Sequence, residues 1–271
     1  MRLLVSPEAR ALGLHHSRAW RLTATAPLLG GDGLTAEQVA AGHDAAAPLP
    51  PGYRKLLAGL GHPEVVPAGE RLRELLATRG WRSHGAVVDA VSVATLRHGA
   101  GIGLHRLLPA DAGRDLVVTR AAGGERIVPA FSTRSRPVPS GDLVYGTRGA
   151  GAAGAAGTDG AAGTPGTAGV AGAAGAAGAA GAAGAASGAG PEPAAGVDAA
   201  GPVEPFAWLG RRDCDSAERQ LAADDREALL VVLGCPGEEA AHTEAIAATI
   251  TELLAGLRPD IALEPLPTVQ G

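Results

Sequence analysis

Apolar residues recur at helical spacing in two long segments of the chain. Residues 70–79 place their three leucines on one face and are followed by Gly80, which predicts a helix that ends at this glycine. Residues 238–257 show the same periodicity and predict a second amphipathic helix, with its isoleucines and leucines turned inward. Shorter helices are expected over residues 7–13 and 53–60.

A further segment, 87–98, is apolar on nearly all sides, which is typical of a helix buried in the centre of a domain. Gly99 is expected to end it. Asp89 lies within this segment, and a buried carboxylate needs hydrogen-bond partners. We therefore expect Asp89 either to hold the backbone amides of a neighbouring loop or to line a ligand pocket.

Runs of β-branched and apolar residues predict strands between these helices. The runs 115–122 and 125–131 flank two consecutive glycines, which is the signal of a β-hairpin. Other strands are expected over residues 18–25, 141–145, 206–210 and 228–234. Helices and strands are mixed rather than strictly alternating. The predicted fold class is therefore α+β, a single domain with a mostly antiparallel sheet and packed helices.

A low-complexity tract divides the chain. From Gly151 to Gly184 a glycine stands at every third position, which is the period of collagen, but Pro165 is the only proline in this repeat. A triple helix is therefore not expected, and we predict a disordered Gly/Ala-rich insert, which costs little loop-closure entropy. The expected organisation is one domain in two halves, the insert between them and a flexible tail: 1–148 and 202–260, 149–201, and 261–271.

Charge and composition exclude several classes of protein. The net charge of −5 argues against a protein that coats DNA or RNA non-specifically, and no DNA partner is expected. A local groove lined by arginine remains open, since Lys55 is the only lysine. No apolar run is long enough for a signal peptide or a membrane span, so a cytoplasmic location is expected.

The cysteine and histidine positions predict neither a disulfide nor a metal site. Cys214 and Cys235 are too few and too far apart for a zinc site, and they are expected to be reduced thiols.

The glycines around residues 99–103 follow a predicted helix, not a strand, and no Lys-Ser or Lys-Thr comes after them. A nucleotide site is therefore not expected, and no cofactor is predicted.

Three stretches, taken in their order and spacing, resemble the pattern of a known family. They are residues 53–61, then Val87-Val88-Asp89 continued to Ile102-Gly103-Leu104-His105, then residues 208–216 with the strand that follows. Together they resemble free-standing relatives of the tRNA-binding and editing (B-three/B-four) domain of the phenylalanyl-tRNA synthetase beta subunit. The resemblance covers about residues 53–257 outside the insert. It implies a domain that receives the aminoacylated 3′ end of a tRNA and hydrolyses an amino acid wrongly attached to it.

The resemblance also suggests the residues of the site. It places His105 in the wall of the amino-acid pocket, at a loop that follows the buried helix, and an acidic loop at 210–216 in the opposite wall. The expected catalytic residues are His105, Asp213 and Asp215. The expected substrate-binding residues are Asp89, Ser92, Gly103, Gly210 and Ser216. The expected tRNA-binding residues are Arg97, Arg106 and Arg211.

The chemistry of this reaction is compatible with these side chains. Hydrolysis of an aminoacyl ester requires an oriented water and stabilisation of the developing oxyanion, but no Ser or Cys nucleophile. A histidine and one or two carboxylates would suffice, and Asp213 and Asp215 would share one face of a strand. A solvated ion-pair cluster with the neighbouring arginines, including Arg219, is the alternative for these two carboxylates.

The departures from the family pattern leave other functions open. Ser92, Arg106 and the pair Arg211-Arg212 stand where relatives carry other residue types. The chain could therefore be an aminoacyl-tRNA deacylase, or a module of the same fold that binds tRNA or an amino-acid-like ligand without catalysis. A small-molecule binder or hydrolase unrelated to tRNA is a third possibility. A complete synthetase is excluded, since nothing here would bind ATP. The sequence does not determine the oligomeric state.

Overall fold

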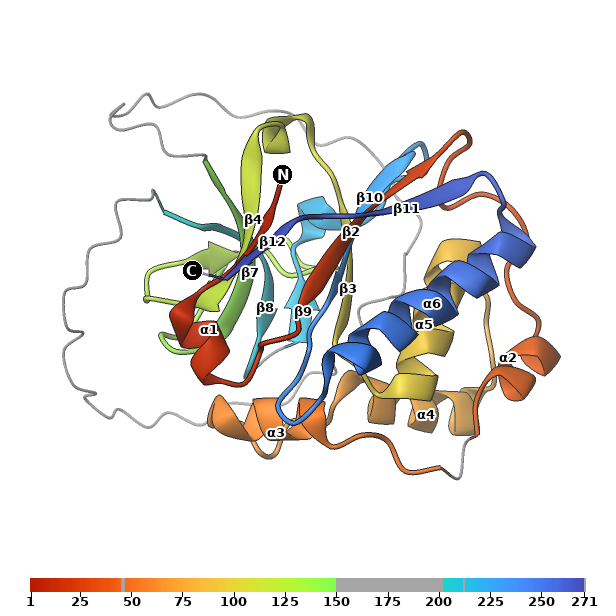
Figure 1. The fold of residues 1–271 in the computed structure, drawn as a ribbon, viewed down its shortest axis with the longest axis horizontal. Helices are drawn as coiled ribbons and strands as arrows, with labels where there is room; N and C mark the ends of the chain where they lie inside the picture. The colour runs from red at the N-terminus through yellow and green to blue at the C-terminus, as the bar shows by residue number, and fades with distance from the viewer. Residues whose placement is uncertain (45–46, 150–201, 212, 271) are drawn as a thin grey trace.

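Two β-sheets lie face to face, and helices cover the outer face of the smaller one (Figure 1). The computed structural model describes residues 1–44, 47–149, 202–211 and 213–270, without the side chain of Asp213. The expected insert, apart from Gly149, therefore lies outside the described residues.

The larger sheet has six strands in the order β12-β1-β4-β7-β8-β9. The pairs β4–β7, β7–β8 and β8–β9 are antiparallel, whereas β1 runs parallel to both β12 and β4. The strands are β12 (Thr268–Gln270), β1 (Leu3–Val5), β4 (Arg114–Arg120), β7 (Leu143–Gly149), β8 (Glu204–Leu209) and β9 (Asp213–Asp215).

The smaller sheet is antiparallel throughout, in the order β11-β2-β10-β3. Its strands are β11 (Ile261–Pro265), β2 (Arg18–Ala24), β10 (Glu227–Val232) and β3 (Ile102–Arg106). A short ribbon of β5 (Arg126–Ile127) and β6 (Arg136–Pro137) lies outside both sheets. The predicted α+β class with a mostly antiparallel arrangement is confirmed.

Six α-helices lie in the described part of the chain. They are α1 (Pro7–Ala11), α2 (Ala36–Gly42), α3 (Gly52–Gly59), α4 (Ala68–Arg79), α5 (Ala86–His98) and α6 (Ala240–Leu257), with 3-10 turns η1 (Pro109–Asp111) and η2 (Ala217–Arg219). Their ends follow the sequence signals: Ser6 caps α1 through its hydroxyl, and Gly99 ends α5 in a left-handed conformation with φ of 63°. None of them is long and apolar enough to cross a membrane.

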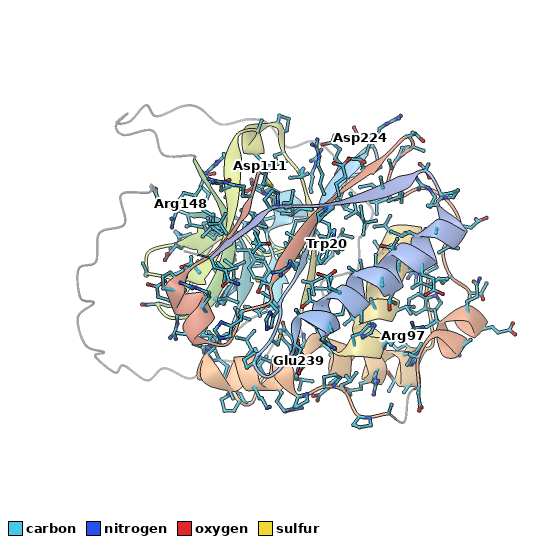
Figure 2. The ribbon with its side chains drawn as sticks, viewed as in Figure 1. Trp20, Arg97, Asp111, Arg148, Asp224 and Glu239 are labelled. Atoms are coloured by element: carbon cyan, nitrogen blue, oxygen red, sulfur yellow. The ribbon has the colours of Figure 1, made fainter. Side chains whose placement is uncertain are left out.

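The core has two main layers because each strand of the smaller sheet alternates its side chains between two faces. Leu229 and Val231 of β10 face the larger sheet and join Leu116, Leu143 and their neighbours. Their neighbours Ala228, Leu230 and Val232 face the opposite way and pack under α5 and α6, where Trp20 also lies (Figure 2). This alternation determines which candidate residues can lie on the same face of the smaller sheet.

The expected hairpin at the glycine pair is wrong. Both edges of β4 are occupied, by β1 on one side and β7 on the other, so the run 125–131 cannot pair with it. Gly123 and Gly124, with φ of 103° and 97°, instead turn the chain away from the sheet. The Glu125 carboxylate accepts hydrogen bonds from the amides of Ala122 and Gly123 and fixes that turn.

Two other regions carry elements that the sequence pattern did not predict. Residues 26–51 contain α2, which begins with a reciprocal capping box between Thr35 and Gln38. The expected tail instead supplies two strands: β11 pairs with β2 and β12 pairs with β1. Short end segments give little periodic signal, and here the open edges of both sheets determine their conformation.

Candidate functional site

His105 and Asp215 meet where the edge strands of the two sheets approach each other. His105 lies in β3, the edge of the smaller sheet, and Asp215 in β9, the edge of the larger one. The distance from His105 Nδ1 to Asp215 Oδ1 is 3.5 Å. These two residues, both expected in the site, are therefore brought together. The expectation that His105 lies on a loop is wrong, because β10 pairs with residues 102–106 over their whole length.

The imidazole of His105 is completely buried between aromatic rings. The rings of Tyr145 and Phe206 contact it edge to face, with centroid distances of 6.1 and 4.8 Å. On its other side lies Gly103, where a Cβ atom would stand 2.3 Å from His105 Nε2. The structure thus explains Gly103 by the space it leaves for the histidine ring.

A β-bulge turns Phe206 toward His105. Tyr145 pairs with Ala207 and Gly146 pairs with Pro205, so Phe206 is the extra residue on β8. Its side chain therefore joins the core between the sheets, as Ala207 does, while Trp208 packs on the opposite face. No sequence signal marked this bulge.

Burial keeps His105 uncharged. Loss of solvent, together with the positive charge of Arg219, lowers the pKa of His105 to about 3. The contact with Asp215 is therefore not an ion pair at neutral pH, and 3.5 Å is long for a hydrogen bond. Neither ring nitrogen has a hydrogen-bond partner among the described residues. Unsatisfied buried polar groups of this kind are uncommon in native proteins.

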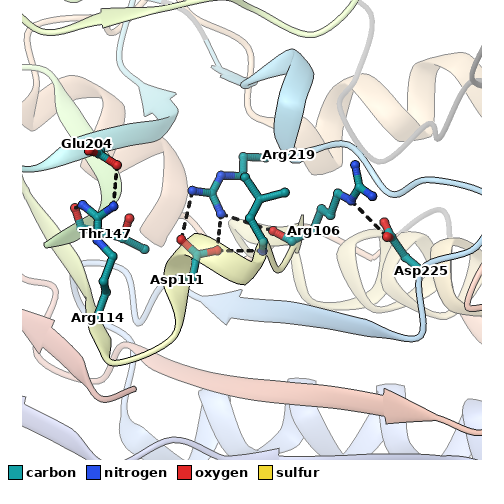
Figure 3. A network of polar contacts seen from close by, with 8 residues as sticks. Arg106, Asp111, Arg114, Thr147, Glu204, Arg219 and Asp225 are labelled. Carbon is teal, nitrogen blue, oxygen red and sulfur yellow. Dashed lines mark hydrogen bonds and ion pairs between the residues drawn. The ribbon is translucent and has the colours of Figure 1, made fainter. Parts of the chain in front are cut away.

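A buried ion pair stands beside this histidine. Both Nη atoms of Arg219 donate to the carboxylate of Asp111, which also accepts from the backbone amide of Leu108 (Figure 3). The guanidinium lies over the Phe206 ring, 4.8 Å from its centroid. Arg219 and Asp111 are both buried, so Arg219 does not belong to a solvated ion-pair cluster.

Asp215 is the most exposed member of this group. Its side chain is 23% exposed, against 1% for His105, 6% for Arg219 and 3% for Asp111. Ser216, which follows it, is buried; its amide donates to the Phe206 carbonyl, and it forms an isolated bridge with Pro129. We call His105, Asp215, Arg219, Asp111 and Phe206 the inter-sheet cluster.

Asp89 and Ser92 are not part of this cluster. Both lie in α5, which packs on the face of the smaller sheet opposite to His105, since His105 shares its face with Leu229 and not with Leu104. The carboxylate of Asp89 accepts from the Leu34 and His84 amides and from the Ser83 hydroxyl, at 2.6 to 2.9 Å. It therefore holds neighbouring loops, which was one of its two expected roles.

The glycine-rich corner at Gly210 belongs to a separate polar group. A Cβ atom at Gly210 would lie within 2.6 Å of the Asp142 carboxylate. That carboxylate accepts from Trp208 Nε1 at 2.6 Å and from the Arg211 amide at 3.2 Å, and it contacts His62 Nε2 at 2.7 Å. Gly210 and Arg211 thus close the turn between β8 and β9. Asp213 lies in β9, but its side chain is outside the described residues.

The three expected tRNA-binding arginines are dispersed. Arg97 donates to the Gly42 carbonyl on the helical side of the molecule, far across the view from Asp111 (Figure 2). Arg106 follows His105 and pairs with Asp225, with Nε and Oδ1 3.0 Å apart (Figure 3). Arg211 is exposed at the β8–β9 turn. These three residues do not form one patch.

The sequence analysis did not identify Asp111 or Phe206 as site residues, and it considered Arg219 only within a possible solvated cluster. Asp111 and Arg219 are 108 residues apart, and neither stands in a pattern that indicates its partner. Within the described residues, no group of three or more His, Cys, Asp or Glu side chains could hold a metal ion. Neither cysteine forms a disulfide within the described residues, and burial raises the pKa of the Cys235 thiol.

Comparisons with solved structures include a weak similarity. No family model and no curated protein sequence matches the chain. A solved structure, an N-terminal fragment of the phenylalanyl-tRNA synthetase beta subunit from Pyrococcus horikoshii, aligns with a TM-score of 0.43 and 7% sequence identity. The alignment covers 99% of this chain and 52% of the fragment, so the chain spans about half the fragment's length. The structural relationship is weak, and it assigns no role to any residue.

Proposed function

We propose that this protein binds the aminoacylated 3′ end of a tRNA at the inter-sheet cluster, with Asp215 contacting the α-ammonium group of the amino acid. The observation that carries the proposal is the pairing of a partly exposed carboxylate with a fully buried, uncharged imidazole. The sequence resemblance carried by residues 53–61, 87–105 and 208–216 supplies the ligand class.

The electrostatics of the cluster support a cationic ligand group at Asp215. Arg219 is bound on both Nη atoms by Asp111, so its charge is already compensated. His105 carries no charge at neutral pH, because its pKa lies near 3. Asp215, at 23% exposed, is the carboxylate of the cluster that solvent reaches most, and an ammonium group is the natural complement of a carboxylate.

Binding assays with charged and uncharged tRNA test this proposal. A panel of tRNAs carrying amide-linked amino acids, which cannot hydrolyse, is compared with the same uncharged tRNAs. We expect at least one aminoacyl species to bind about tenfold more tightly than its uncharged form, a difference of about 1.4 kcal/mol. Asp215→Asn should remove that difference. Asp224→Asn, a matched change at an exposed aspartate, should keep it. Equal binding of all charged and uncharged forms would refute the proposal.

A second candidate is hydrolysis of a misacylated tRNA at the same place. The contact between His105 and Asp215 favours it, because a small movement would let the neutral imidazole donate to the carboxylate and orient it toward a water. In this scheme Asp215 is the general base, and His105 is a positioning residue. A histidine with a pKa near 3 is a poor proton shuttle at neutral pH.

Deacylation assays separate the two candidates. Mischarged aminoacyl-tRNAs are incubated with the wild type, Asp215→Ala and His105→Ala. Hydrolysis of one species by the wild type, lost in Asp215→Ala, supports the deacylase. Salt-dependent tRNA binding without hydrolysis of any species supports the binding module.

A further inference from the structure

One exposed aromatic residue stands on a strained turn beside the inter-sheet cluster. Phe131 is 67% exposed, the most exposed large hydrophobic side chain among the described residues. Its φ of 60° lies in the left-handed region, which no other described non-glycine residue occupies. Such a conformation is unfavourable for a bulky residue, and strained positions concentrate at functional sites.

The backbone fixes this turn directly to the strand that carries Asp215. The amide of Ser132 donates to the Pro129 carbonyl and closes the turn, while the amide of Ala130 donates to the Asp215 carbonyl at 2.7 Å. The Ala217 amide donates to the Val128 carbonyl at 2.8 Å. The Phe131 ring is therefore carried on a segment that is held next to the candidate site and not on a free loop.

The same segment has a local positive charge. Residues 126–137 contain three arginines, Arg126, Arg134 and Arg136, and no acidic residue, although the whole chain has a net charge of −5. All three side chains are exposed. Arg126 donates to the side chain and carbonyl of Ser135, and in the described part of the chain none of the three forms an ion pair. We call residues 126–137 the arginine ribbon.

An exposed aromatic ring among unpaired arginines suits one class of ligand. Single-stranded nucleic acid is bound by stacking of bases on aromatic rings and by contacts of cationic side chains with phosphates. A folded protein partner would require a wider apolar surface than one phenylalanine, and a lipid surface would require more apolar side chains than this ribbon exposes. The charge and the ring together favour an unpaired RNA strand.

We propose that the arginine ribbon binds the unpaired 3′ strand of the RNA, with Phe131 stacking on a base and the arginines contacting the phosphates. This inference rests on the proposed function and deepens it, because it names the surface that would deliver the acceptor end to Asp215. The backbone of the Phe131 turn is hydrogen-bonded to the β9 strand, so a base stacked on Phe131 would lie on the same side of the molecule as the aminoacyl group.

The test uses uncharged tRNA transcripts, so that the aminoacyl group plays no part in it. One transcript has an intact single-stranded 3′ end, and the other lacks its last four nucleotides. We expect the wild-type protein to bind the intact transcript about tenfold more tightly, as one or two stacked bases would give. Phe131→Leu, which keeps an apolar side chain without a ring, should lose most of that preference, because only the arginine contacts with the phosphates remain. Phe131→Trp should restore the preference.

The arginines are tested through the salt dependence of binding. Changing Arg126, Arg134 and Arg136 together to glutamine should reduce the slope of log affinity against log salt by about 2, at roughly 0.7 for each phosphate contact on a single strand. Arg82→Gln, at an exposed arginine after α4, is the matched control and should leave the slope unchanged. Thermal unfolding of each variant checks that the fold is retained.

The outcomes separate this inference from the proposed function. If Phe131→Leu keeps the wild-type preference for the intact transcript, the inference is wrong, whatever the charged tRNAs show. The proposed function is judged by the difference between charged and uncharged tRNA and by Asp215→Asn. If the wild type prefers neither the intact transcript nor any charged form, both are wrong.

Discussion

Two buried polar side chains, Asp89 and His105, lie on opposite faces of the smaller sheet and differ in how their polar atoms are satisfied. The Asp89 carboxylate accepts from three donors that come from two loops. The His105 imidazole is equally buried, yet neither of its nitrogens has a hydrogen-bond partner among the described residues. A satisfied buried group stabilises the fold, whereas an unsatisfied one costs stability and calls for another reason to be present.

This difference separates a structural residue from a candidate functional one without reference to any relative. Asp89 and His105 were both expected in the same site, and composition or spacing could not distinguish them. They are distinguished by the face of the smaller sheet on which each lies and by whether hydrogen-bond donors surround the side chain.

The largest effect is expected for Asp89→Ala. This change removes a fully buried acceptor that serves two backbone amides and a hydroxyl, so we expect a loss of about 4 kcal/mol in the free energy of unfolding. Asp89→Asn keeps one acceptor oxygen and should cost less. Urea unfolding of both variants measures the difference. A loss of less than 1 kcal/mol in the free energy of unfolding of Asp89→Ala would contradict a structural role for Asp89.

Arg219→Met should destabilise the protein by about 3 kcal/mol, because it leaves the Asp111 carboxylate buried without its partner. The double variant Asp111→Leu, Arg219→Met removes both charges and should recover most of that loss. The comparison is made by urea unfolding at pH 7. If the double variant is as unstable as the single one, the packing of Arg219 against Phe206 matters more than the charge.

His105→Phe tests the unsatisfied imidazole through its pH dependence. The folded pKa of about 3 lies below the ordinary 6.5, so the unfolded chain binds a proton below pH 6.5 that the folded protein excludes. This histidine therefore lowers stability as the pH falls from 6.5 toward 3 and has no such effect above 6.5. Between pH 7 and pH 4 the free energy of unfolding should therefore fall by about 3 kcal/mol less in the variant than in the wild type.

At pH 7 the same variant should be within about 1 kcal/mol of the wild type, since a ring of similar shape replaces an unsatisfied polar one. His98, whose pKa is lowered to about 4 mainly by burial, remains in both proteins, so its contribution cancels in the comparison. Parallel stability curves of wild type and variant between pH 7 and 4 would contradict the burial of a neutral His105.

The smallest effect is expected at Phe131. Asparagine tolerates a positive φ better than phenylalanine, so Phe131→Asn should stabilise the protein by about 0.5 kcal/mol. Thermal unfolding should show a slightly raised midpoint, with RNA binding weakened at the same time. A gain in stability together with a loss of binding is the pattern expected of a strained functional residue. A lower midpoint would mean that the Phe131 ring stabilises the fold.

The sequence by itself determined the local elements with strong periodic or capping signals. The apolar run of α5 with Gly99, the leucine face of α4 and the periodic α6 are all where the pattern predicts them, because these signals act within a few residues. It also selected His105 and Asp215 as members of one site, and the structure places them 3.5 Å apart.

The tertiary structure alone decided which faces meet. The alternation along β10 places Asp89 and His105 on opposite sides of the smaller sheet, and the bulge at Phe206 turns that ring toward the histidine. The Asp111–Arg219 pair joins residues 108 positions apart, and the C-terminal strands form because two sheet edges are open to them. Strand pairing and burial depend on contacts between distant segments, and a local pattern carries no record of its partner.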